Sequence, residues 1–165
     1  MIDSSKFQKL NNLYDQGINP FPNKFKKKHF AKDIVSKYSK LKDGEHTKNT
    51  VSVAGRIMTT RVMGKAAFFT LQDQSGKIQL FGSKDNLKNY NLLKKLDRGD
   101  IVGVKGIVFK TKRGEVSIDV KSYDLLTKSL ANLPEKWKGL VDQELRYRKR
   151  FTDLVANREV FELFL

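Results

Sequence analysis

Four residues near the middle of the chain carry side chains that suit binding to unpaired bases. Phe68 and Phe69 are adjacent in a segment with strand periodicity, so one ring faces outward if the other faces a core. An outward ring on a basic surface stacks on bases, at about 1–3 kcal/mol per base, without choosing among them. Choice needs polar groups: the amide of Gln79 is both donor and acceptor, and the guanidinium of Arg61 is a forked donor. These residue types indicate recognition of single-stranded nucleic acid.

Each of these residues also has an ordinary structural interpretation. One of Phe68 and Phe69 belongs to the core, and the pattern leaves open which. Gln79 suits a solvated strand position, and Arg61 could form an ion pair with a nearby carboxylate such as Asp73. The convergence of the candidate side chains on the first three strands favours the binding interpretation.

The sequence offers little for catalysis or metal binding. It has no Cys and two His, His29 and His46, both in polar surroundings, which argues against disulfides, thiolate sites and a His-centred triad. The motifs GxxxxGK[ST], GxGxxG and HExxH do not occur. We therefore predict no catalytic residue, no metal site and no cofactor in this chain.

The charge is strongly positive. Thirty-three Lys and Arg face 18 Asp and Glu, giving +15 at pH 7. Such a field attracts polyanions, with nucleic acid the first candidate and a membrane surface the second. A Lys-rich composition that reflects codon usage and solubility is the competing explanation. The N-terminus lacks the apolar core of a secretory signal and no apolar run reaches membrane-spanning length, so we expect a cytoplasmic protein with no membrane partner.

Residues 50–130 have the pattern of a small barrel. Strand periodicity occurs at 51–57, 66–71, 77–81, 101–109 and 115–126, and a helical pattern at 84–96 falls between the third and fourth strands. The turn at 73–76 predicts a hairpin in which Gly76 supplies a positive φ. Five strands with a helix after the third predict an OB-fold, a barrel that binds oligonucleotides on one face. A generic small barrel without a ligand remains open.

Two regions flank this barrel, and the predicted fold class is mainly β with helices. Residues 1–49 predict a basic N-terminal extension with short helices at 4–16 and 31–38 and a Lys cluster at 24–28. Residues 131–165 predict a helical hinge, with a helix over 142–157 that has Asp142 as its N-cap. The apolar pattern up to Leu165 predicts either truncation of a longer protein or a short tail packed on the barrel.

Several blocks of sequence resemble one family in order and spacing. They are GRIMTTR at 55–61, FFTLQD at 68–73, GKIQL at 76–80 and LDRGDIVGVKG at 96–106. These blocks resemble the anticodon-binding domain of lysyl-tRNA synthetases, in the class II subgroup that also holds the aspartyl and asparaginyl enzymes. LPEKWKGL at 133–140 with RYRKRF at 146–151 resembles the hinge to that family's catalytic domain, and NPFP at 19–22 resembles its N-terminal segment.

The resemblance implies roles for four residues. In that subgroup a Phe on strand two stacks on the central anticodon uridine, a Gln on strand three reads the base and an Arg on strand one assists. These positions fall on Phe68, Gln79 and Arg61. In lysyl members a Glu between strands four and five also contacts the anticodon, and it falls on Glu115, which could otherwise be a solvated turn residue. The partner implied is the tRNA-Lys anticodon stem-loop.

The resemblance also implies the activity of a parent protein. The family uses ATP and magnesium to activate lysine and join it to tRNA in a separate antiparallel-sheet domain, and the parent is expected to be a homodimer. The sequence stops where the first motif of that domain would begin, so we expect a chain that forms no lysyl-adenylate alone. A stand-alone truncated paralogue, a general single-strand nucleic-acid-binding OB protein and an interaction scaffold are the alternatives.

Overall fold

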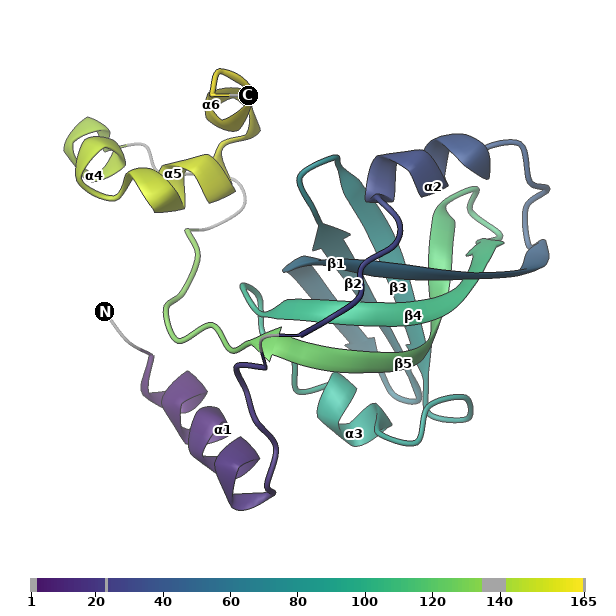
Figure 1. The fold of residues 1–165 in the computed structure, drawn as a ribbon, viewed down its shortest axis with the longest axis horizontal. Helices are drawn as coiled ribbons and strands as arrows, with labels where there is room; N and C mark the ends of the chain where they lie inside the picture. Colours follow the sequence, from purple (N-terminus) through teal and green to yellow (C-terminus); the bar gives the residue numbers. More distant parts are fainter. Residues whose placement is uncertain (1–2, 23, 135–141, 165) are drawn as a thin grey trace. The chain divides into compact units, whose positions relative to one another are not determined.

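The computed structural model describes residues 3–22, 24–134 and 142–164. They belong to two compact units, one with the described residues up to 130 and one with those from 131 onward. The first unit contains a β-barrel and the second contains short helices (Figure 1). The candidate site residues all lie in the first unit.

Five strands form the barrel. They are β1 His46–Met63, β2 Ala66–Gln72, β3 Lys77–Ser83, β4 Ile101–Lys110 and β5 Val116–Thr127. The order around the closed barrel is β1-β2-β3-β5-β4, with every neighbouring pair antiparallel except the parallel pair β3–β5. The five-strand pattern read from the sequence is confirmed, and the barrel is an OB-fold.

The length of β1 allows the barrel to close. The first half of this strand pairs with β4 and the second half pairs with β2, with a register irregularity between Ile57 and Thr59. Such a bulge bends a strand and increases its twist. At Gly55 a Cβ would lie 2.4 Å from the backbone oxygen of Gln72, and at Gly106 it would lie 2.3 Å from a backbone oxygen of β5. A side chain at either glycine would force neighbouring strands apart.

Alternation along β2 separates core from surface. Phe69 and Leu71 are at most 1% exposed and belong to the barrel core, whereas Phe68 and Thr70 are half-buried on the outer face. Successive side chains of a strand point to opposite faces, so one Phe of the pair must leave the core. The choice that the sequence left open is settled here, with Phe69 inside.

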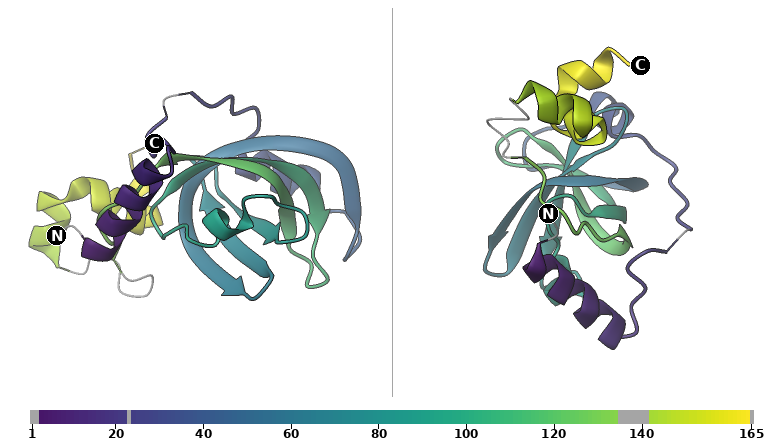
Figure 2. Two further views of the ribbon diagram at one scale, coloured as in Figure 1. Left: turned by 90° about the horizontal axis from the view of Figure 1, so that it is seen from below. Right: turned by 90° about the vertical axis from the view of Figure 1, so that its left-hand side faces the viewer.

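Helices cover the two ends of the barrel. Helix α2 Ala31–Lys37 buries Ala31 and Ile34 in the barrel core. Helix α3 Tyr90–Leu93 lies at the opposite end (Figures 1 and 2). The sequence predicted a longer helix over 84–96. Its first part instead forms turns, consistent with the presence of Asp85, Asn86 and Asn89, because such side chains compete for backbone hydrogen bonds and favour turns.

The segment before α2 lies along β1. The N–H groups of Lys28 and His29 donate to the carbonyl of Ser52 at 3.1 and 3.0 Å. Ser52 in turn donates two hydrogen bonds, from its N–H to Nδ1 of His29 at 3.1 Å and from its hydroxyl to the carbonyl of Lys26 at 2.8 Å. Backbone groups of the basic cluster at 24–28 therefore help to hold it against the barrel, and Lys26 and Lys28 make these bonds without their side chains.

Asp73 joins this segment to the β2–β3 turn. Its Oδ1 accepts hydrogen bonds from the N–H and hydroxyl of Ser75 and from the N–H of Gly76, at 2.6–3.0 Å. Its Oδ2 accepts from Nζ of Lys27 and the N–H of Ala31, both at 3.0 Å. Gly76 has no positive φ, contrary to the sequence prediction. The Asp73 carboxylate, and not a left-handed glycine, holds this turn.

Those bonds also control the ionisation of Asp73. Burial alone would raise the pKa of its carboxyl group, but the hydrogen bonds from Ser75, Ala31 and Lys27 outweigh burial and lower the pKa below its ordinary value. The carboxylate of Asp97 has a lowered pKa for similar reasons, since bonds from Lys128 and Lys9 outweigh its burial.

A buried ion pair fixes the loop that leads into β4. Asp100 is 0% exposed, and its carboxylate accepts from Nζ of Lys128 at 2.8 and 3.0 Å. It also accepts from the backbone N–H groups of Asp97 and Ser129 at 2.7 and 2.8 Å. Removing one partner of such a pair leaves a buried charge without compensation, which is strongly destabilising. The sequence block LDRGD thus has a structural role at the end of the barrel.

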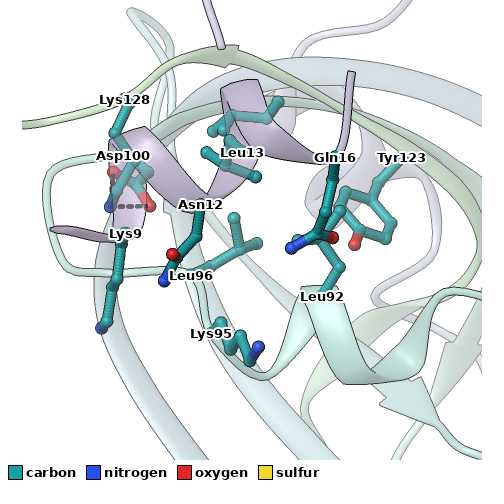
Figure 3. Close-up of a pocket in the computed structure, with 11 residues that line it drawn as sticks. Lys9, Asn12, Leu13, Gln16, Leu92, Lys95, Leu96, Asp100, Tyr123 and Lys128 are labelled. Atoms are coloured by element: carbon teal, nitrogen blue, oxygen red, sulfur yellow. Dashed lines mark hydrogen bonds and ion pairs between the residues drawn. The ribbon is translucent and has the colours of Figure 1, made fainter. Parts of the chain in front are cut away.

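Helix α1 Ser4–Asp15 packs beside this ion pair. Lys9 Nζ lies 2.6 Å from Oδ1 of Asp97, and Lys6 Nζ donates to the carbonyl of Arg98 at 3.2 Å. A cavity of about 40 Å³ lies under the helix, lined by Leu13 among others (Figure 3). It is far too small for a nucleotide, although a cavity of this size holds water.

The second unit contains α4 Gln143–Arg148, α5 Arg150–Ala156 and α6 Arg158–Glu162. Asp142 caps α4 as predicted, accepting from the N–H of Leu145 at 3.1 Å. The predicted single helix over 142–157 is broken at Lys149, whose φ and ψ are −119° and 51°. The buried carboxylate of Asp153 forms ion pairs with Arg146 and Arg150, which lie on the two sides of that break. Most of the predicted hinge block at 133–140, and Leu165, lie outside the described residues.

The described residues show neither a membrane-spanning helix nor a metal-binding cluster. None of the helices within them is long and apolar enough to cross a membrane. The same residues contain no group of three or more His, Cys, Asp or Glu side chains that could hold a metal ion.

The alternation of β2 predicts unequal costs for its two aromatic residues. Phe69→Ala should lower the free energy of unfolding by about 3–5 kcal/mol, because it empties a core position. Phe68→Ala should cost about 1 kcal/mol, since this ring is half-buried on the outer face. Urea denaturation of the two variants measures the difference. Equal losses would contradict the assignment of Phe69 to the core.

The lowered pKa of Asp73 predicts acid sensitivity. A carboxyl group whose folded pKa lies below its unfolded value, about 3.9, stabilises the fold fully above that value. The contribution is lost as the pH falls through the folded pKa. Urea midpoints measured at pH 5 and pH 3 should therefore differ less in Asp73→Asn than in the wild type. Some dependence should remain, because Asp97 acts in the same direction. An unchanged pH dependence in the variant would refute the role of Asp73.

Candidate nucleic-acid interface

The outer face of the first three strands brings together the predicted stacking and cationic residues. Arg61 on β1 is the register partner of Phe68 on β2, and Phe68 is in turn the partner of Phe81 on β3. A hydrogen bond of 2.7 Å between the hydroxyls of Thr59 and Thr70 shows that this half of β1 presents odd-numbered side chains to the same face. Arg61, Phe68 and Phe81 therefore form one lateral row.

Arg61 does not form the ion pair that was its alternative interpretation. Asp73 uses its oxygens on the β2–β3 turn, Lys27 and Ala31. The Arg61 side chain is exposed near the end of β1. Arg61 is thus an exposed residue beside Phe68 in the register of the two strands.

Gln79 is held by two neighbours. Its Oε1 accepts from the hydroxyl of Ser117 on β5 at 3.0 Å, and its Nε2 donates to Oε2 of Glu115 at 2.6 Å. Ser117 is 0% exposed, and its hydroxyl lies closer to Oε1 of Gln79 than to its second acceptor, the carbonyl of Glu115 at 3.2 Å. Among the described residues, this leaves Gln79 one amide N–H and one carbonyl lone pair without a partner. The structure thus places Glu115, the residue before β5, next to Gln79 on β3.

A groove adjoins the Gln79–Glu115 pair. It has a volume of about 330 Å³ and lies between α2, β3 and the β4–β5 turn, with Val35, Ser39, Lys77 and Lys110 in its lining. That volume is at the lower end of the range for small-ligand pockets, which extends from about 300 to 1,000 Å³. The groove offers space for a group held beside the Gln79 amide.

Four rings form a continuous row on the outside of the barrel. Phe68 and Phe81 have centroids 5.1 Å apart, and Phe81 meets Phe109 of β4 edge-on at 5.8 Å. His46 stacks on Phe109 at 4.8 Å with an interplanar angle of 9°. Sequence reasoning missed Phe81, Phe109 and Ser117. Phe81 could have been found from its spacing, because it lies two residues after Gln79 and so shares its face.

Comparison with known proteins bears on the nature of this face. The tRNA anticodon family of OB-fold nucleic acid binding domains matches residues 51–126. Lysine–tRNA ligases match nearly the whole chain. The enzyme of Carboxydothermus hydrogenoformans is 48% identical over 162 residues, which cover 97% of this chain and 32% of that protein. Residues 51–126 are thus similar to tRNA anticodon OB-fold domains, and the chain as a whole is similar to part of lysine–tRNA ligases.

Two other lysine–tRNA ligases match the chain to a similar extent. That of Legionella pneumophila is 48% identical over 163 residues (96% of this chain, 32% of that protein), and that of Nostoc punctiforme is 43% identical over 173 residues (99% and 31%). The chain therefore spans about a third of the length of the lysine–tRNA ligases it matches. The resemblance to lysyl-tRNA synthetases read from the sequence is confirmed.

Proposed function

We propose that the barrel binds the anticodon loop of a lysine-specific tRNA, as the N-terminal part of a cytoplasmic lysine–tRNA ligase. The observation that carries the proposal is the shared outer face on which Arg61, Phe68 and Gln79 lie on neighbouring strands. In this proposal residues 50–130 are the anticodon-binding domain and residues 1–49 are its basic extension. Residues 131–165 form the hinge toward the remainder of the ligase.

Phe68 is the stacking residue in this mechanism. Phe81 supports its ring from the side, and the half-buried position leaves part of the ring open to a base. Stacking of this kind contributes about 1–3 kcal/mol per base and tolerates every base. Phe68 therefore sets affinity, and the choice of base depends on the polar groups around it.

Gln79 and Arg61 together can favour uracil. The edge of uracil presents a ring N–H between two carbonyl oxygens, whereas cytosine has an unprotonated ring nitrogen there and an amino group in place of one carbonyl. The free lone pair and N–H of the Gln79 amide can satisfy the uracil N–H and one carbonyl. Gln79 alone could also pair with cytosine. The donor-only guanidinium of Arg61 suits the second carbonyl and opposes an amino group, so discrimination needs both residues.

Cations around the site attract the phosphates of the RNA backbone. Arg61, Lys77, Lys112 and Arg113 are all exposed on or beside the outer face, and the chain carries a net charge of +15. Each phosphate that these groups neutralise releases counterions, so affinity falls linearly with the logarithm of salt concentration. This term is independent of sequence and should be the same for matched and altered loops.

The rest of the ligase supplies the reaction. In the parent protein, ATP and magnesium support the joining of lysine to its tRNA, and we propose that it acts as a homodimer. The described residues contain no group of three or more His, Cys, Asp or Glu side chains that could hold a metal ion. Anticodon binding by the barrel would position the far end of the tRNA for that reaction, and this chain alone should form no lysyl-adenylate.

The central test compares two stem-loops that differ at the middle anticodon base, uridine or cytidine. Wild-type protein should bind the uridine loop more tightly, with the same salt slope for both. Phe68→Ala should weaken binding to both loops by about 1–3 kcal/mol. Gln79→Leu should retain stacking and lose the preference. Isothermal titration calorimetry at two salt concentrations measures all of these effects.

A matched control for charge is Lys94→Ala, an exposed cation beside α3 at the end of the barrel opposite α2. It should leave the preference unchanged, whereas Arg61→Ala should reduce it. Equal affinity of the wild type for both loops would reject anticodon reading and leave a general single-strand-binding OB protein.

Ser117 should act as a positioning residue for Gln79. Ser117→Ala removes the hydroxyl that fixes Oε1 of Gln79, so the amide can turn and the uridine preference should fall several-fold. The salt slope and the stacking contribution should not change. Ser122→Ala, an exposed serine on the same strand, is the control. If Ser117→Ala keeps the full preference, the orientation of Gln79 does not depend on this bond.

A further inference from the structure

The row of rings on the outer face extends well beyond the proposed uridine site. Phe68 and Phe81 lie at one end, and the stacked pair of Phe109 and His46 lies at the other. Phe109 is 8% exposed, yet it is not part of the barrel core, because its ring lies on the outside under His46 and beside Phe81. Phe109 is therefore covered by other aromatic rings on the outer face and does not contribute to the barrel core.

His46 forms the exposed end of this row. Its ring lies parallel to that of Phe109, at a centroid distance of 4.8 Å, and the residue is exposed. One face of the imidazole is therefore supported by Phe109, while the opposite face is directed to solvent. This is the geometry of a stacking platform, and His is one of the side chains on which RNA-binding proteins stack unpaired bases.

The register places His46 too far from Gln79 to serve the same base. Gln79 pairs with Ser117, Ser117 with Phe109, and Phe109 with His46, along one line across four strands. Neighbouring strands are about 4.8 Å apart, so the two residues are separated by roughly 14 Å. OB-folds occupy about 4–16 nucleotides of a single strand, which requires contacts beyond a single base.

The surroundings of His46 suit a nucleic-acid strand. Lys48 is exposed on the same edge of β1, and Lys112 and Arg113 are exposed in the β4–β5 turn. The end of β4 that leads into this turn is joined to the residues before β1 by backbone bonds, from the N–H of Lys110 to Glu45 at 2.9 Å and from the N–H of Gly44 to Lys110 at 3.0 Å. The platform and its cations therefore lie at one corner of the barrel.

We propose that His46, supported by Phe109, stacks on a second unpaired base of the RNA whose central uridine occupies the Phe68 site. The proposal rests on the proposed function and extends it to a second nucleotide position. Stacking does not choose among bases, so His46 adds affinity and fixes the path of the strand without adding sequence preference. The ring row then holds the loop at its two ends, with Phe81 and Phe109 between them.

The test uses the full chain and a set of anticodon stem-loops in which each unpaired nucleotide, apart from the central uridine, is replaced in turn by an abasic nucleotide. Each RNA is titrated into the wild type, His46→Ala and His46→Phe. For one position the abasic change should weaken binding to the wild type at least about fivefold. The same change should alter binding to His46→Ala less than about twofold, because the partner ring is already absent.

His46→Phe retains a flat ring and should reproduce the wild-type pattern. Lys48→Ala is the matched control, because it removes a cation from the same strand and should weaken all loops alike without altering the abasic pattern. Circular dichroism melting verifies that the variants are folded. Equal abasic effects in the wild type and His46→Ala at every position would overturn the proposal and leave His46 as a cover for Phe109.

The two proposals fail in different ways. Equal affinity of the wild type for the uridine and cytidine loops would reject base reading at Gln79. Even then, a position-specific abasic effect that disappears in His46→Ala would support the second platform. A retained uridine preference without any His46-dependent position would reject the platform alone. Absence of measurable binding to every stem-loop would reject both.

Discussion

The parallel pairing of β3 with β5 is the constraint on which the proposed binding face depends. This pairing closes the barrel and sets Gln79 opposite Ser117. Because β5 follows directly from the β4–β5 turn, the same pairing brings Glu115 within 2.6 Å of the Gln79 amide. It also places Phe81 next to Phe109, which lie on strands that are not hydrogen-bonded to each other. A barrel left open at this seam would keep Phe68 and Arg61 together but would leave Gln79 without its orienting partners.

Buried carboxylates hold the peripheral segments to that barrel. Asp73 ties the basic N-terminal segment to the β2–β3 turn, and Asp100 with Lys128 fixes the loop before β4 beside α1. These contacts are polar and specific, so they determine where the extension lies more than they add net stability. The N-terminal segment consequently lies on the barrel through backbone bonds to Ser52, and the lysine side chains at 24, 26 and 28 are left available for other roles.

Much of the fold follows from local pattern, whereas the site depends on contacts between distant residues. Alternation predicted the five strands, because a residue spacing of two reports directly which face is buried. The helix at 84–96 was predicted too long, because its apolar spacing was given more weight than the turn-forming residues Asp85, Asn86 and Asn89.

Arg61, Phe68 and Gln79 could be proposed from residue type, and Glu115 from family resemblance. The bond from Ser117 to Gln79 joins residues 38 positions apart, and no local signal predicts it. Likewise, His46 was placed in polar surroundings, because its partner Phe109 lies 63 positions away (109 minus 46).

The most direct measurement of the central claim follows the side-chain amide of Gln79 itself. In ¹⁵N-labelled protein, the Gln79 NH₂ signals would be assigned with Gln79→Leu and then followed during titration with the two stem-loops. We expect a large shift at saturation with the uridine loop and a much smaller one with the cytidine loop, because Arg61 opposes the amino group of cytosine and so disfavours pairing of that base with the Gln79 amide. Saturating binding of the uridine loop with unmoved Gln79 signals would contradict the claim that this residue reads the central base.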